Sequence, residues 1–455
     1  MLASHTLPRR IHLIGAGGIG VSAIGTFFAQ RGAVISGTDI ELPPRNLLPP
    51  GEYREGHHPE MIVRGIDLIV YSDAVPSDDP ERVRARELQI PEMNFAKALG
   101  AVTAGRPTIA ISGTHGKSTT TALTGLFFEA AGLDPSVFVG AVVPAWEKNV
   151  RLGTGPFIVE ADEYREHMME LSPTTIAITN LEWDHPDYYR DSIHVMSVFS
   201  GFLKKLGTDG IAVINVGNPN TRHAAAGCDS RRVTYALDAD AELTLRTTSE
   251  SNERFRVSWH GTDMGEFSTL LPGRHNKENI ACALATFLTT CENWRAVASV
   301  LETFRGIGRR FEEIGMLGTT LVVSDYAHHP TALDAVVHAA YERYQNKRIL
   351  FVFRPHQMER TRKLFDEYVR VIQRIPDLLV LEVYDVPGRS SKDTISSRDL
   401  LDIAVGGETA SHHFAPDLSA AEAFLRAAAQ RYDIIVVIGA GDADKLARAL
   451  VNSAS

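Results

Sequence analysis

The sequence predicts an α/β protein in which mostly parallel sheets are divided among three domains. Short β-branched runs alternate with amphipathic helical segments along almost the whole chain, which is the pattern of repeated βα units. The length of 455 residues, at about 150 residues per domain, makes three domains the central expectation. Because ligands of open α/β sheets bind at the carboxyl ends of the strands, we expect the functional loops there.

The predicted strands follow one another along the chain. They are RIHLIG, AVISGTD, DLIVYS, TIAISG, FIVEAD, TIAITN, GIAVIN, TLVVSD, RILFVF, LLVLEVY and DIIVVIG. Helical segments separate them, and the first of these helices runs through Ile24 and Phe28. Between residues 231 and 271 the residues alternate in character, as in ELTLRTT and RFRVSW, which predicts antiparallel strands inserted in the middle domain.

Two glycine-containing joints divide the chain into its expected domains. The segment GAVTAGRP, at residues 100–107, precedes a new strand and a glycine loop. The segment GIGRRFEEIGMLG, at residues 306–318, connects helical sequence to the strand TLVVSD. We therefore expect domains at residues 1–106, 107–313 and 314–455.

Composition excludes several classes of protein. The 46 Lys and Arg residues against 56 Asp and Glu residues give a net charge of -10, so a nucleic-acid binder is not expected. Three cysteines, Cys228, Cys282 and Cys291, cannot form a disulfide framework in a chain of this size and favour a reducing cytoplasm. The first residues contain no apolar signal region, and no run approaches the roughly 18 apolar residues of a membrane span. We expect a cytoplasmic protein that is neither secreted nor inserted in a membrane.

The first glycine loop follows the first predicted strand. Its sequence, GAGGIG, begins at Gly15, and Asp39 closes the next strand 39 − 15 = 24 residues later. Glycines let backbone N–H groups approach a pyrophosphate at a helix N-terminus, and a carboxylate at the second strand end accepts ribose hydroxyls. NAD(P) is the default ligand of this pattern, and a tight turn without a ligand is the structural alternative.

The second glycine loop, GTHGKSTT, spans residues 113–120 between the strand TIAIS and a helix. It is shorter than GxxxxGK[ST], because the residue five before Gly116 is Ile111. Its residues are nevertheless those expected of a phosphate-binding loop. Lys117 would neutralise phosphate charge, and Ser118 or Thr119 would offer a hydroxyl to Mg²⁺. A purely structural glycine turn would have no use for the adjacent lysine and hydroxyls.

Acidic residues and a histidine follow two later strands. FIVEADEY ends a strand at Glu160, with Asp162 and Glu163 next, and carboxylates at such a strand tip hold Mg²⁺ beside a phosphate loop. NLEWDHPDYY places Asp184 and His185 after the neighbouring strand, 185 − 160 = 25 residues later. Taken alone, His185 is more often structural than a ligand, but its position after the adjacent βα unit favours a ligand.

The segment LPGRHNKENIACALA places three polar residues at the start of a helix. They are His275, Asn276 and Asn279. Asn276 alone is explained as an N-cap, but that assignment leaves His275 and Asn279 without a purpose.

The last third of the chain carries a second group of polar residues. Tyr326 and His328 follow the strand TLVVSD, and His356 and Arg360 lie four residues apart in FVFRPHQMERTRKLF. If Pro355 opens a helix, the two share one helix face. Arginines of such a segment are often only solvated charges, but this grouping suits a small carboxylate, which guanidinium binds through two parallel hydrogen bonds.

The motifs stand in one order across residues 10–442. They are GAGGIG, SGTD, GTHGKSTT, EADEY, NLEWDHPDY, PGRHNKENIACALA, RRFE, DYAHHP and RPHQMERTR. In this set the sequence resembles the Mur ligases of peptidoglycan synthesis, and within them the members that attach L-alanine to UDP-N-acetylmuramate. The resemblance implies a Rossmann-like N-terminal domain for the UDP-sugar, a central P-loop-type ATPase domain and a Rossmann-like C-terminal domain for the amino acid. It also assigns the first glycine loop to the UDP pyrophosphate and not to NAD, since ATP has its own loop.

The resemblance implies a role for each motif. The catalytic residues would be Lys117, Glu160 and His185, and the magnesium ligands Ser118, Glu160 and His185. ATP would contact Gly113, Thr114, Gly116, Lys117, Ser118, Thr119, His275, Asn276, Asn279 and Arg310. The UDP-sugar would contact Gly15, Gly17, Gly18, Gly20, Asp39, His57 and Ser72. L-Alanine would contact Tyr326, His328, His356 and Arg360, and His185 and His328 are the candidate bases for its amine.

The sequence departs from the family pattern at a few positions. Tyr164, followed by Arg165, replaces the usual serine after EADE, Met358 replaces a tyrosine, and the segment DVPGRSSKD follows LEVY in place of a different loop. These departures bear on the exact substrate more than on the reaction. Some Mur ligases carry a carbamylated lysine about fifteen residues after the histidine, but Ser200 stands there, so no carbamate is expected.

Three other functions compete with ligation of L-alanine. A sister ligase would attach a preformed tripeptide to the same UDP-sugar in cell-wall recycling. A nicotinamide-dependent oxidoreductase would use GAGGIG but leave GTHGKSTT and Glu160 without a purpose. A non-catalytic UDP-sugar-binding regulator would not need the ATP and metal residues. In the favoured interpretation the partners are small molecules, namely UDP-N-acetylmuramate, L-alanine and ATP, and the oligomeric state does not follow from the sequence.

Overall fold

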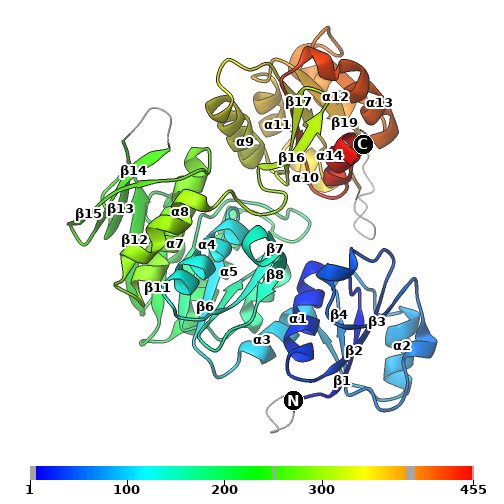
Figure 1. The fold of residues 1–455 in the computed structure, drawn as a ribbon, viewed down its shortest axis with the longest axis vertical. Coiled ribbons are helices and arrows are strands. Elements are labelled where there is room, and N and C mark those ends of the chain that lie inside the picture. Colours follow the sequence, from blue (N-terminus) through cyan, green and yellow to red (C-terminus); the bar gives the residue numbers. More distant parts are fainter. Residues whose placement is uncertain (1–6, 249–252, 386–394, 453–455) are drawn as a thin grey trace.

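Three sheets, one in each of three domains, organise the molecule (Figure 1). The structure is a computed structural model that describes residues 7–248, 253–385 and 395–452. The segment 386–393 of the unusual loop after LEVY therefore lies outside the described residues.

The N-terminal sheet is parallel throughout, in the order β3-β2-β1-β4-β5. This is a Rossmann-like arrangement, in which β1 lies at the centre and the chain moves outward on both sides. Its strands are β1 (Arg10–Ile14), β2 (Val34–Asp39), β3 (Gly51–Glu55), β4 (Leu68–Tyr71) and β5 (Glu92–Asn94). Its helices are α1 (Ile19–Ala29), η1 (Arg45–Leu47), η2 (Pro59–Met61), α2 (Pro80–Glu87) and α3 (Phe95–Thr103).

The central sheet has ten strands in the order β15-β14-β13-β12-β11-β10-β6-β9-β7-β8. Its parallel part runs from β13 to β7, and β14, β15 and β8 pair with their neighbours in antiparallel fashion. The strands are β6 (Thr108–Ser112), β7 (Ser136–Val143), β8 (Lys148–Arg151), β9 (Phe157–Glu160), β10 (Thr175–Ile178), β11 (Ile211–Asn215), β12 (Arg231–Leu237), β13 (Leu243–Thr247), β14 (Arg254–Trp259) and β15 (Thr262–Ser268). The helices are α4 (Lys117–Ala130), η3 (Pro144–Trp146), η4 (Tyr164–Glu170), α5 (Ser192–Leu203), η5 (Lys204–Leu206), α6 (Pro219–Ala224), α7 (Arg274–Leu288), η6 (Trp294–Val297) and α8 (Ala298–Thr303).

The C-terminal sheet has six strands in the order β16-β17-β21-β18-β19-β20, all parallel except β16. Separate apolar clusters pack on its two faces, so helices cover it on both sides. The strands are β16 (Glu312–Leu317), β17 (Thr320–Asp325), β18 (Ile349–Phe353), β19 (Leu378–Leu381), β20 (His412–Ala415) and β21 (Ile434–Ile438). The helices are α9 (Pro330–Arg343), α10 (Met358–Lys363), α11 (Phe365–Ile372), α12 (Ser397–Val405), α13 (Leu418–Ala428), η7 (Ala429–Arg431) and α14 (Ala443–Asn452).

The predicted fold class is confirmed, and two details differ. Every predicted strand lies in one of the three sheets, but β12 and β13 extend the parallel sheet, so antiparallel pairing begins only between β13 and β14 and continues to β15. Glu312 and Glu313, which we assigned to the central domain, pair with Ser324 and Val323 of β17. The C-terminal sheet therefore begins two residues before the expected boundary, because these glutamates form a solvent-facing edge strand.

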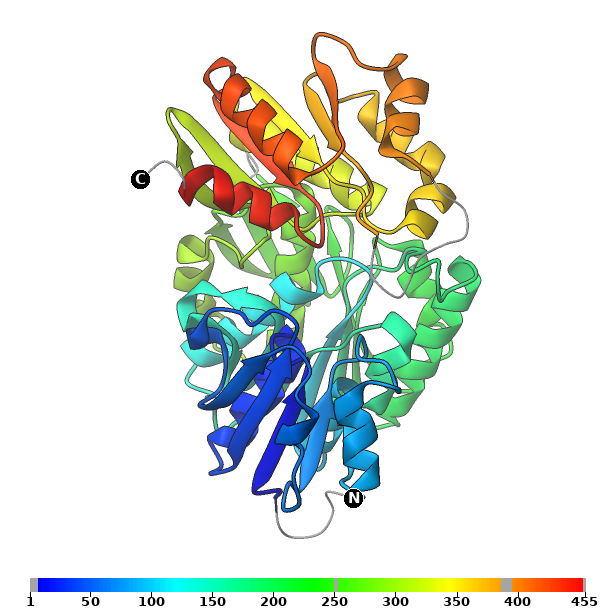
Figure 2. The ribbon, with the colours of Figure 1, turned by 90° about the vertical axis from the view of Figure 1, so that its right-hand side faces the viewer.

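The N-terminal and central domains share one apolar core. The ring of Phe27 on α1 lies 6.4 Å from that of Phe138 and 6.1 Å from that of Phe157, both in the central sheet. The N-terminal domain also meets the C-terminal domain through an exposed ion pair of 2.7 Å between Glu41 and Lys445. Figure 2 shows the three domains in one column, with the central domain between the other two.

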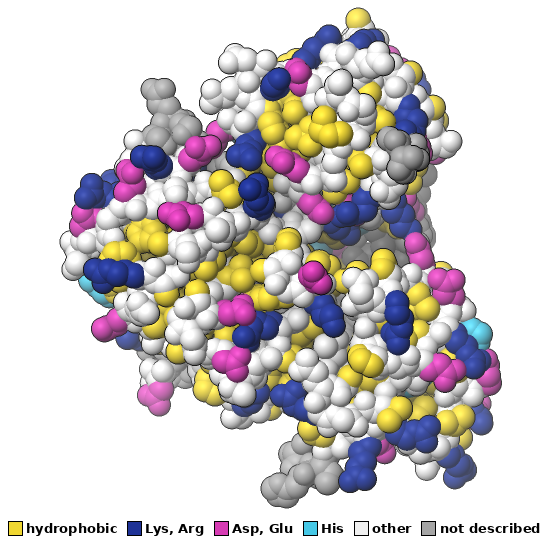
Figure 3. Space-filling view, in the orientation of Figure 1, with side chains coloured by type: hydrophobic (Ala, Val, Ile, Leu, Met, Phe, Trp, Pro, Cys, Tyr) yellow, Lys and Arg dark blue, Asp and Glu magenta, His cyan; other side chains and the backbone are white. Residues whose placement is uncertain are grey.

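The molecule is notched where the C-terminal and N-terminal domains face each other, and lysine and arginine side chains line part of this notch (Figure 3). No helix in the described part of the chain has the length and apolar character needed to span a membrane.

Candidate active site

The second glycine loop connects β6 to α4, and its geometry requires its glycines. Gly113 and Gly116 have φ angles of 135° and 82°, in the left-handed range that favours glycine. A Cβ atom at position 116 would lie 2.0 Å from Oδ1 of Asn279. Because α4 begins at Lys117, directly after this turn, the N–H groups of its first turn form an anion-binding helix N-terminus.

Lys117 is anchored above the loop by acceptors on three residues. Its Nζ atom lies 2.6 Å from a carboxylate oxygen of Glu163 and donates to the carbonyl oxygens of Gly113, at 2.7 Å, and Thr114, at 3.1 Å. Burial alone would lower the pKa of Lys117, but the carboxylates of Glu163 and Asp162 outweigh burial and raise it. Lys117 is therefore a fixed positive charge at the loop.

Ser118 and Glu160 form a pair of oxygen donors beside Lys117. The Ser118 hydroxyl donates to Oε1 of Glu160 at 3.0 Å, and the Gly140 N–H donates to Oε2 at 2.6 Å. Burial raises the pKa of Glu160, against the opposing effect of the Lys117 charge. A buried carboxylate whose ionised form is disfavoured gains from a nearby cation, so this pair suits a hard metal ion.

Glu163 connects Lys117 to His185, a role that the sequence analysis did not give it. One oxygen of Glu163 contacts Lys117, and the other lies 3.5 Å from Nε2 of His185. Burial would lower the pKa of His185, but Asp184 and Glu163 raise it. The Nδ1 atom of His185 is buried and has no hydrogen-bond partner among the described residues. The third carboxylate of the EADE motif was the available signal for Glu163.

A pocket of about 260 Å³ lies between the central and C-terminal domains, beside the phosphate loop. The predicted ATP residues that line it are Gly116, Ser118, Thr119, His275, Asn276, Asn279 and Arg310. Gly113, Thr114 and Lys117 form the loop beneath and are not among its lining residues. Its remaining lining includes Asn180, Glu182, Asn215, Asn218 and Glu278 of the central domain and Asp325, Ala327, Thr331 and Ala335 of the C-terminal domain, none of which the sequence analysis assigned to ATP.

The helix start at α7 confirms the predicted positions of its polar residues. Gly273 occupies the N-cap position, so Asn276 is not the N-cap. Asn276 instead donates to the Pro272 carbonyl at 2.8 Å and accepts from Asn279 at 3.2 Å. Burial, with a smaller effect from Lys277, lowers the pKa of His275 to about 4, so its imidazole is neutral at pH 7.

Asp325 supports the wall of the pocket that the C-terminal domain contributes. Its carboxylate accepts from the Phe311 N–H at 2.8 Å and the Ala327 N–H at 2.7 Å. Burial raises the pKa of Asp325, and Arg310 opposes that rise. Arg310 also lies 5.0 Å from the ring of Tyr326, so Asp325 and Tyr326 hold this arginine at the pocket.

The first glycine loop, Asp39 and Ser72 converge at the carboxyl edge of the N-terminal sheet. The N–H of Gly17 donates to Oδ2 of Asp39 at 2.7 Å. A Cβ atom on Gly15, whose φ is 78°, would lie 2.9 Å from Cβ of Ser72. Gly18 and Gly20 continue this loop into α1. Asp39 thus shapes the loop directly, in addition to the predicted contact with a ligand.

His57 lies at the same edge, in the loop after β3, but it contacts Asp79 and not the first glycine loop. Its Nδ1 atom is 2.9 Å from Oδ2 of Asp79, and its side chain is 53% exposed. This exposure leaves the ring accessible to a ligand, while its ion pair ties it to the N-terminus of α2.

The predicted amino-acid residues form one cluster. The His328 ring lies 5.3 Å from that of Tyr326 and 5.5 Å from that of His356. Nη1 of Arg360 lies 3.2 Å from Nδ1 of His356. His356 and Arg360 were predicted to meet because they share one helix face, but α10 begins at Met358 and not at Pro355. His356 precedes the helix and pairs with Tyr384 in a β-bridge, so the two residues meet across a turn and not on one helix face.

Arg360 is also an inter-domain residue. It is 1% exposed, and its Nε atom donates to Oδ1 of Asp184, in the central domain, at 2.8 Å. Burial would raise the pKa of Asp184, but Arg360 holds it well below the usual range. The sequence contained no signal for this pair, whose members lie 176 residues apart.

Tyr164, the main departure from the family pattern, packs against the candidate metal site. Its ring lies 4.9 Å from that of His185, and its hydroxyl donates to Oδ2 of Asp187 at 3.1 Å. It therefore helps to orient His185. Met358, the other departure, is the first residue of α10.

His167 links the N-terminal and central domains through two carboxylates. Its Nε2 atom lies 3.1 Å from Asp73 and its Nδ1 atom 3.3 Å from Asp162. Burial would lower the pKa of His167, but the hydrogen bonds to Asp162 and Asp73 raise it to about 9. The imidazolium is thus an ionic bridge beside the first glycine loop.

The raised pKa of His167 predicts that stability falls as the solution becomes alkaline. The stabilisation that protonated His167 gives the folded state is complete below the unfolded pKa of 6.5. It is lost as pH rises through the folded pKa of about 9. This shift of the His167 pKa corresponds to at most about 3 kcal/mol in the free energy of unfolding, or several degrees in the midpoint of thermal unfolding. We expect the midpoint to fall more between pH 7 and pH 10 in the wild type than in His167→Gln. Parallel curves for the two proteins would contradict this assignment.

This three-domain α/β chain, with two glycine loops on separate sheets and a pocket between domains, belongs to the Mur ligase family, whose models match nearly its whole length. Residues 10–106 match the family model described as Mur ligase family, catalytic domain. Residues 111–287 match the Mur ligase middle domain, and residues 309–441 match the Mur ligase, glutamate ligase domain.

Among its relatives are enzymes named UDP-N-acetylmuramate--L-alanine ligase. The one from Syntrophotalea carbinolica is 33% identical over 448 residues, which cover 97% of each chain. The one from Desulfitobacterium hafniense is 32% identical over 454 residues, 98% of this chain and 100% of the relative. The solved UDP-N-acetylmuramate-alanine ligase of Thermotoga maritima superposes with a TM-score of 0.80 at 28% identity and covers 98% of this chain and 99% of that one.

Proposed function

We propose that the chain uses ATP to join L-alanine to the lactyl carboxylate of UDP-N-acetylmuramate. The observation that carries this proposal is the presence of two glycine loops at the carboxyl edges of two different sheets. One chain can then hold a UDP-sugar and ATP at once, as an ATP-dependent ligation requires. The names of the relatives support the same substrates.

In this proposal each domain binds one substrate. Residues 1–106 hold the UDP-sugar through Gly15, Gly17, Gly18, Gly20, Asp39, His57 and Ser72. Residues 107–313 hold ATP on the second glycine loop and in the adjoining pocket, where His275, Asn276, Asn279 and Arg310 border the nucleotide. Residues 314–455 hold L-alanine at Tyr326, His328, His356 and Arg360.

The reaction needs activation because attack on a free carboxylate would have to expel oxide. The lactyl carboxylate therefore attacks the γ-phosphate of ATP, and the bond to the β-phosphate breaks to give an acyl phosphate and ADP. Lys117, fixed at the loop by Gly113, Thr114 and Glu163, stabilises negative charge on the transferring group. The C-terminal domain, which forms one wall of the pocket, excludes water that would hydrolyse the acyl phosphate.

The donor set fits magnesium at Ser118 and Glu160. Their oxygens lie 3.0 Å apart, and burial raises the pKa of Glu160, so a bound cation would favour its ionised form. His185 would complete the set, since its Nδ1 atom is buried without a partner among the described residues. Bound magnesium would neutralise phosphate charge.

The amine of L-alanine must lose a proton as it attacks the acyl carbon and expels phosphate. Of the two candidate bases, we favour His328. Its Nδ1 atom lies 2.9 Å from the Tyr326 carbonyl oxygen, which can only accept, so the proton is on Nδ1 and Nε2 carries the lone pair. Burial and the Arg360 charge hold the pKa of His328 well below its usual range, so the ring is neutral. The pKa of His185, in contrast, is raised.

A coupled assay for ADP release tests the proposed reaction. We expect release only when UDP-N-acetylmuramate and L-alanine are both present, because the acyl phosphate forms on the sugar carboxylate and turns over with the amine. Equal release without the sugar would contradict the ligase assignment. If the tripeptide L-alanyl-γ-D-glutamyl-meso-diaminopimelate replaced L-alanine with a higher kcat/KM, the sister ligase would be the correct assignment.

A further inference from the structure

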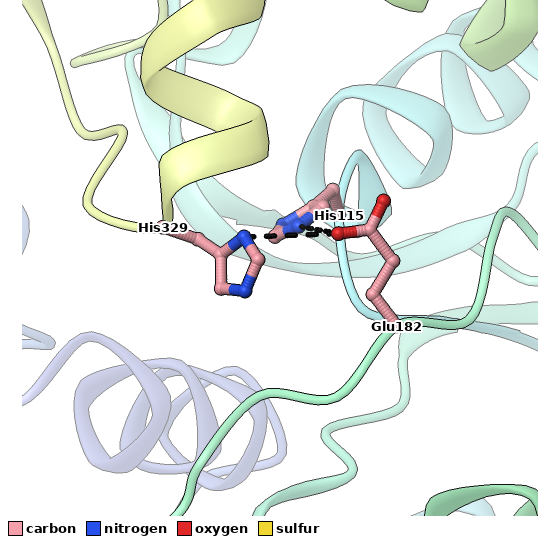
Figure 4. Close-up of side chains that lie close together, drawn as sticks. All are labelled: His115, Glu182 and His329. Carbon is pink, nitrogen blue, oxygen red and sulfur yellow. Dashed lines mark ion pairs between the residues drawn. The ribbon is translucent and has the colours of Figure 1, made fainter. Parts of the chain in front are cut away.

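His115, Glu182 and His329 come together outside the proposed magnesium site (Figure 4). His115 belongs to the second glycine loop, Glu182 follows β10, and His329 occupies the N-cap position of α9 in the C-terminal domain. Nε2 of His115 lies 3.5 Å from Oε2 of Glu182, and Nδ1 of His329 lies 3.7 Å from the same oxygen. All three ligand atoms lie within 4.8 Å of one another.

We propose that these three residues bind a transition-metal ion of the zinc type. Two imidazole nitrogens and one carboxylate oxygen are a donor set that zinc uses in proteins, with ligand distances of about 2.0–2.2 Å. Ligands at those distances around a tetrahedral ion lie roughly 3.3–3.5 Å from one another. The carboxylate oxygen of Glu182 is already near that distance from both nitrogens, and the two nitrogens, which lie within 4.8 Å of each other, would move closer together around a bound ion.

The hydrogen bonds of His329 prepare its Nδ1 atom as a ligand. Its Nε2 atom lies 3.3 Å from the Trp183 carbonyl oxygen, which can only accept, so Nε2 carries the proton. The lone pair is then on Nδ1, where the Thr331 N–H donates over a long 3.3 Å. This lone pair also faces the Glu182 oxygen at 3.7 Å, an arrangement that a cation between the two atoms would stabilise. A backbone carbonyl that fixes the tautomer is the usual support of a metal-binding histidine.

His115 and Glu182 also present atoms that can bind a metal ion. The Nε2 atom of His115 is buried without a hydrogen-bond partner among the described residues. Burial would raise the pKa of Glu182, but His115 and His329 lower it to about 2, so the carboxylate is ionised at pH 7.

The site differs from the magnesium site in both chemistry and position. Two of its three ligands are imidazole nitrogens, which favour zinc, cobalt or nickel, whereas the proposed magnesium site has two oxygen donors and one imidazole. The site spans two domains, since Glu182 and His115 are central and His329 is C-terminal. A bound ion would therefore hold the cleft in the arrangement described here. His115 and Glu182 also line the nucleotide pocket, which leaves a coordination position open to water.

Titration of the full chain with Co²⁺, without nucleotide or magnesium, tests this site through the visible absorption of the bound ion. We expect saturable binding of one Co²⁺, displaced by Zn²⁺, and at least about 10-fold weaker binding in His329→Asn and in His115→Asn. Asparagine at position 329 preserves an N-cap acceptor for α9, and thermal unfolding checks that both variants fold.

Two further variants serve as controls. His338→Asn removes a 72% exposed histidine of the same helix, and it should bind Co²⁺ like the wild type. His185→Asn tests whether Co²⁺ occupies the proposed magnesium site instead, and it should retain the absorption. Absence of saturable binding, or binding that is lost in His185→Asn and kept in His329→Asn, would overturn the proposal. Because no ligation is measured, the result is independent of the proposed function.

Discussion

Lys117→Ala should lower turnover by about 100-fold or more, with little change in affinity for the UDP-sugar. A fixed positive charge on a transferring phosphoryl group is worth several kcal/mol of transition-state stabilisation. The UDP-sugar, in contrast, is assigned to a loop on another sheet. Steady-state ADP release measures the first effect, and calorimetric titration with UDP-N-acetylmuramate measures the second.

The controls separate loss of the charge from loss of the loop. Removing Lys117 leaves Glu163 and two loop carbonyls without their cation, so Lys117→Met, which keeps more of the side-chain volume, should show the same loss. Lys205→Ala removes an exposed lysine after α5 and should behave like the wild type. If UDP-sugar binding collapsed while ADP release continued, the assignments of the two glycine loops would be exchanged.

Most of the buried parallel strands were predictable because they are short apolar runs between glycine and acidic residues, although SVFVGAVV, which forms β7, was not predicted. TLVVSD and DIIVVIG form β17 and β21. These strands are covered on both faces, so almost all of their residues are buried and the sequence is apolar along nearly the whole strand. The strands GEYRE and EEIGML, which form β3 and β16, were not predicted. Both lie at sheet edges and contain no buried residue, so neither needs the continuous apolar run of a buried strand.

The loops of the site were predictable, whereas the contacts between them were not. Most of the motifs stand at the end of a strand, so their positions follow from the fold class. The pairing of Asp184 with Arg360 depends instead on how two separate domains meet. The start of α10 was misplaced because Pro355 is a common first helical residue, but His356 first pairs with Tyr384, and Gln357 takes a φ of 72°.

Arg360→Lys should raise KM for L-alanine by about 10-fold or more and leave KM for ATP near its wild-type value. The guanidinium makes separate contacts through Nε, to Asp184, and through Nη1, to His356. Lysine keeps the charge but has one nitrogen in place of the planar fork, so it cannot hold both partners and a carboxylate in one geometry. The substitution Arg360→Ala is less suitable for this test. It would leave Asp184 as a buried unpaired charge, at a cost of about 3–5 kcal/mol in folding stability.

Arg362→Lys is the matched control for this prediction. Arg362 lies two residues further on the same helix, is 45% exposed and pairs only weakly, at 3.2 Å, with Glu359. Its substitution should leave both KM values unchanged. Thermal unfolding of both variants shows whether a loss of the inter-domain pair, and not of alanine binding, explains the Arg360→Lys kinetics. If the two substitutions act alike, or if only the ATP kinetics change, L-alanine binds elsewhere, because the structure places Arg360 inside the cluster and Arg362 outside it.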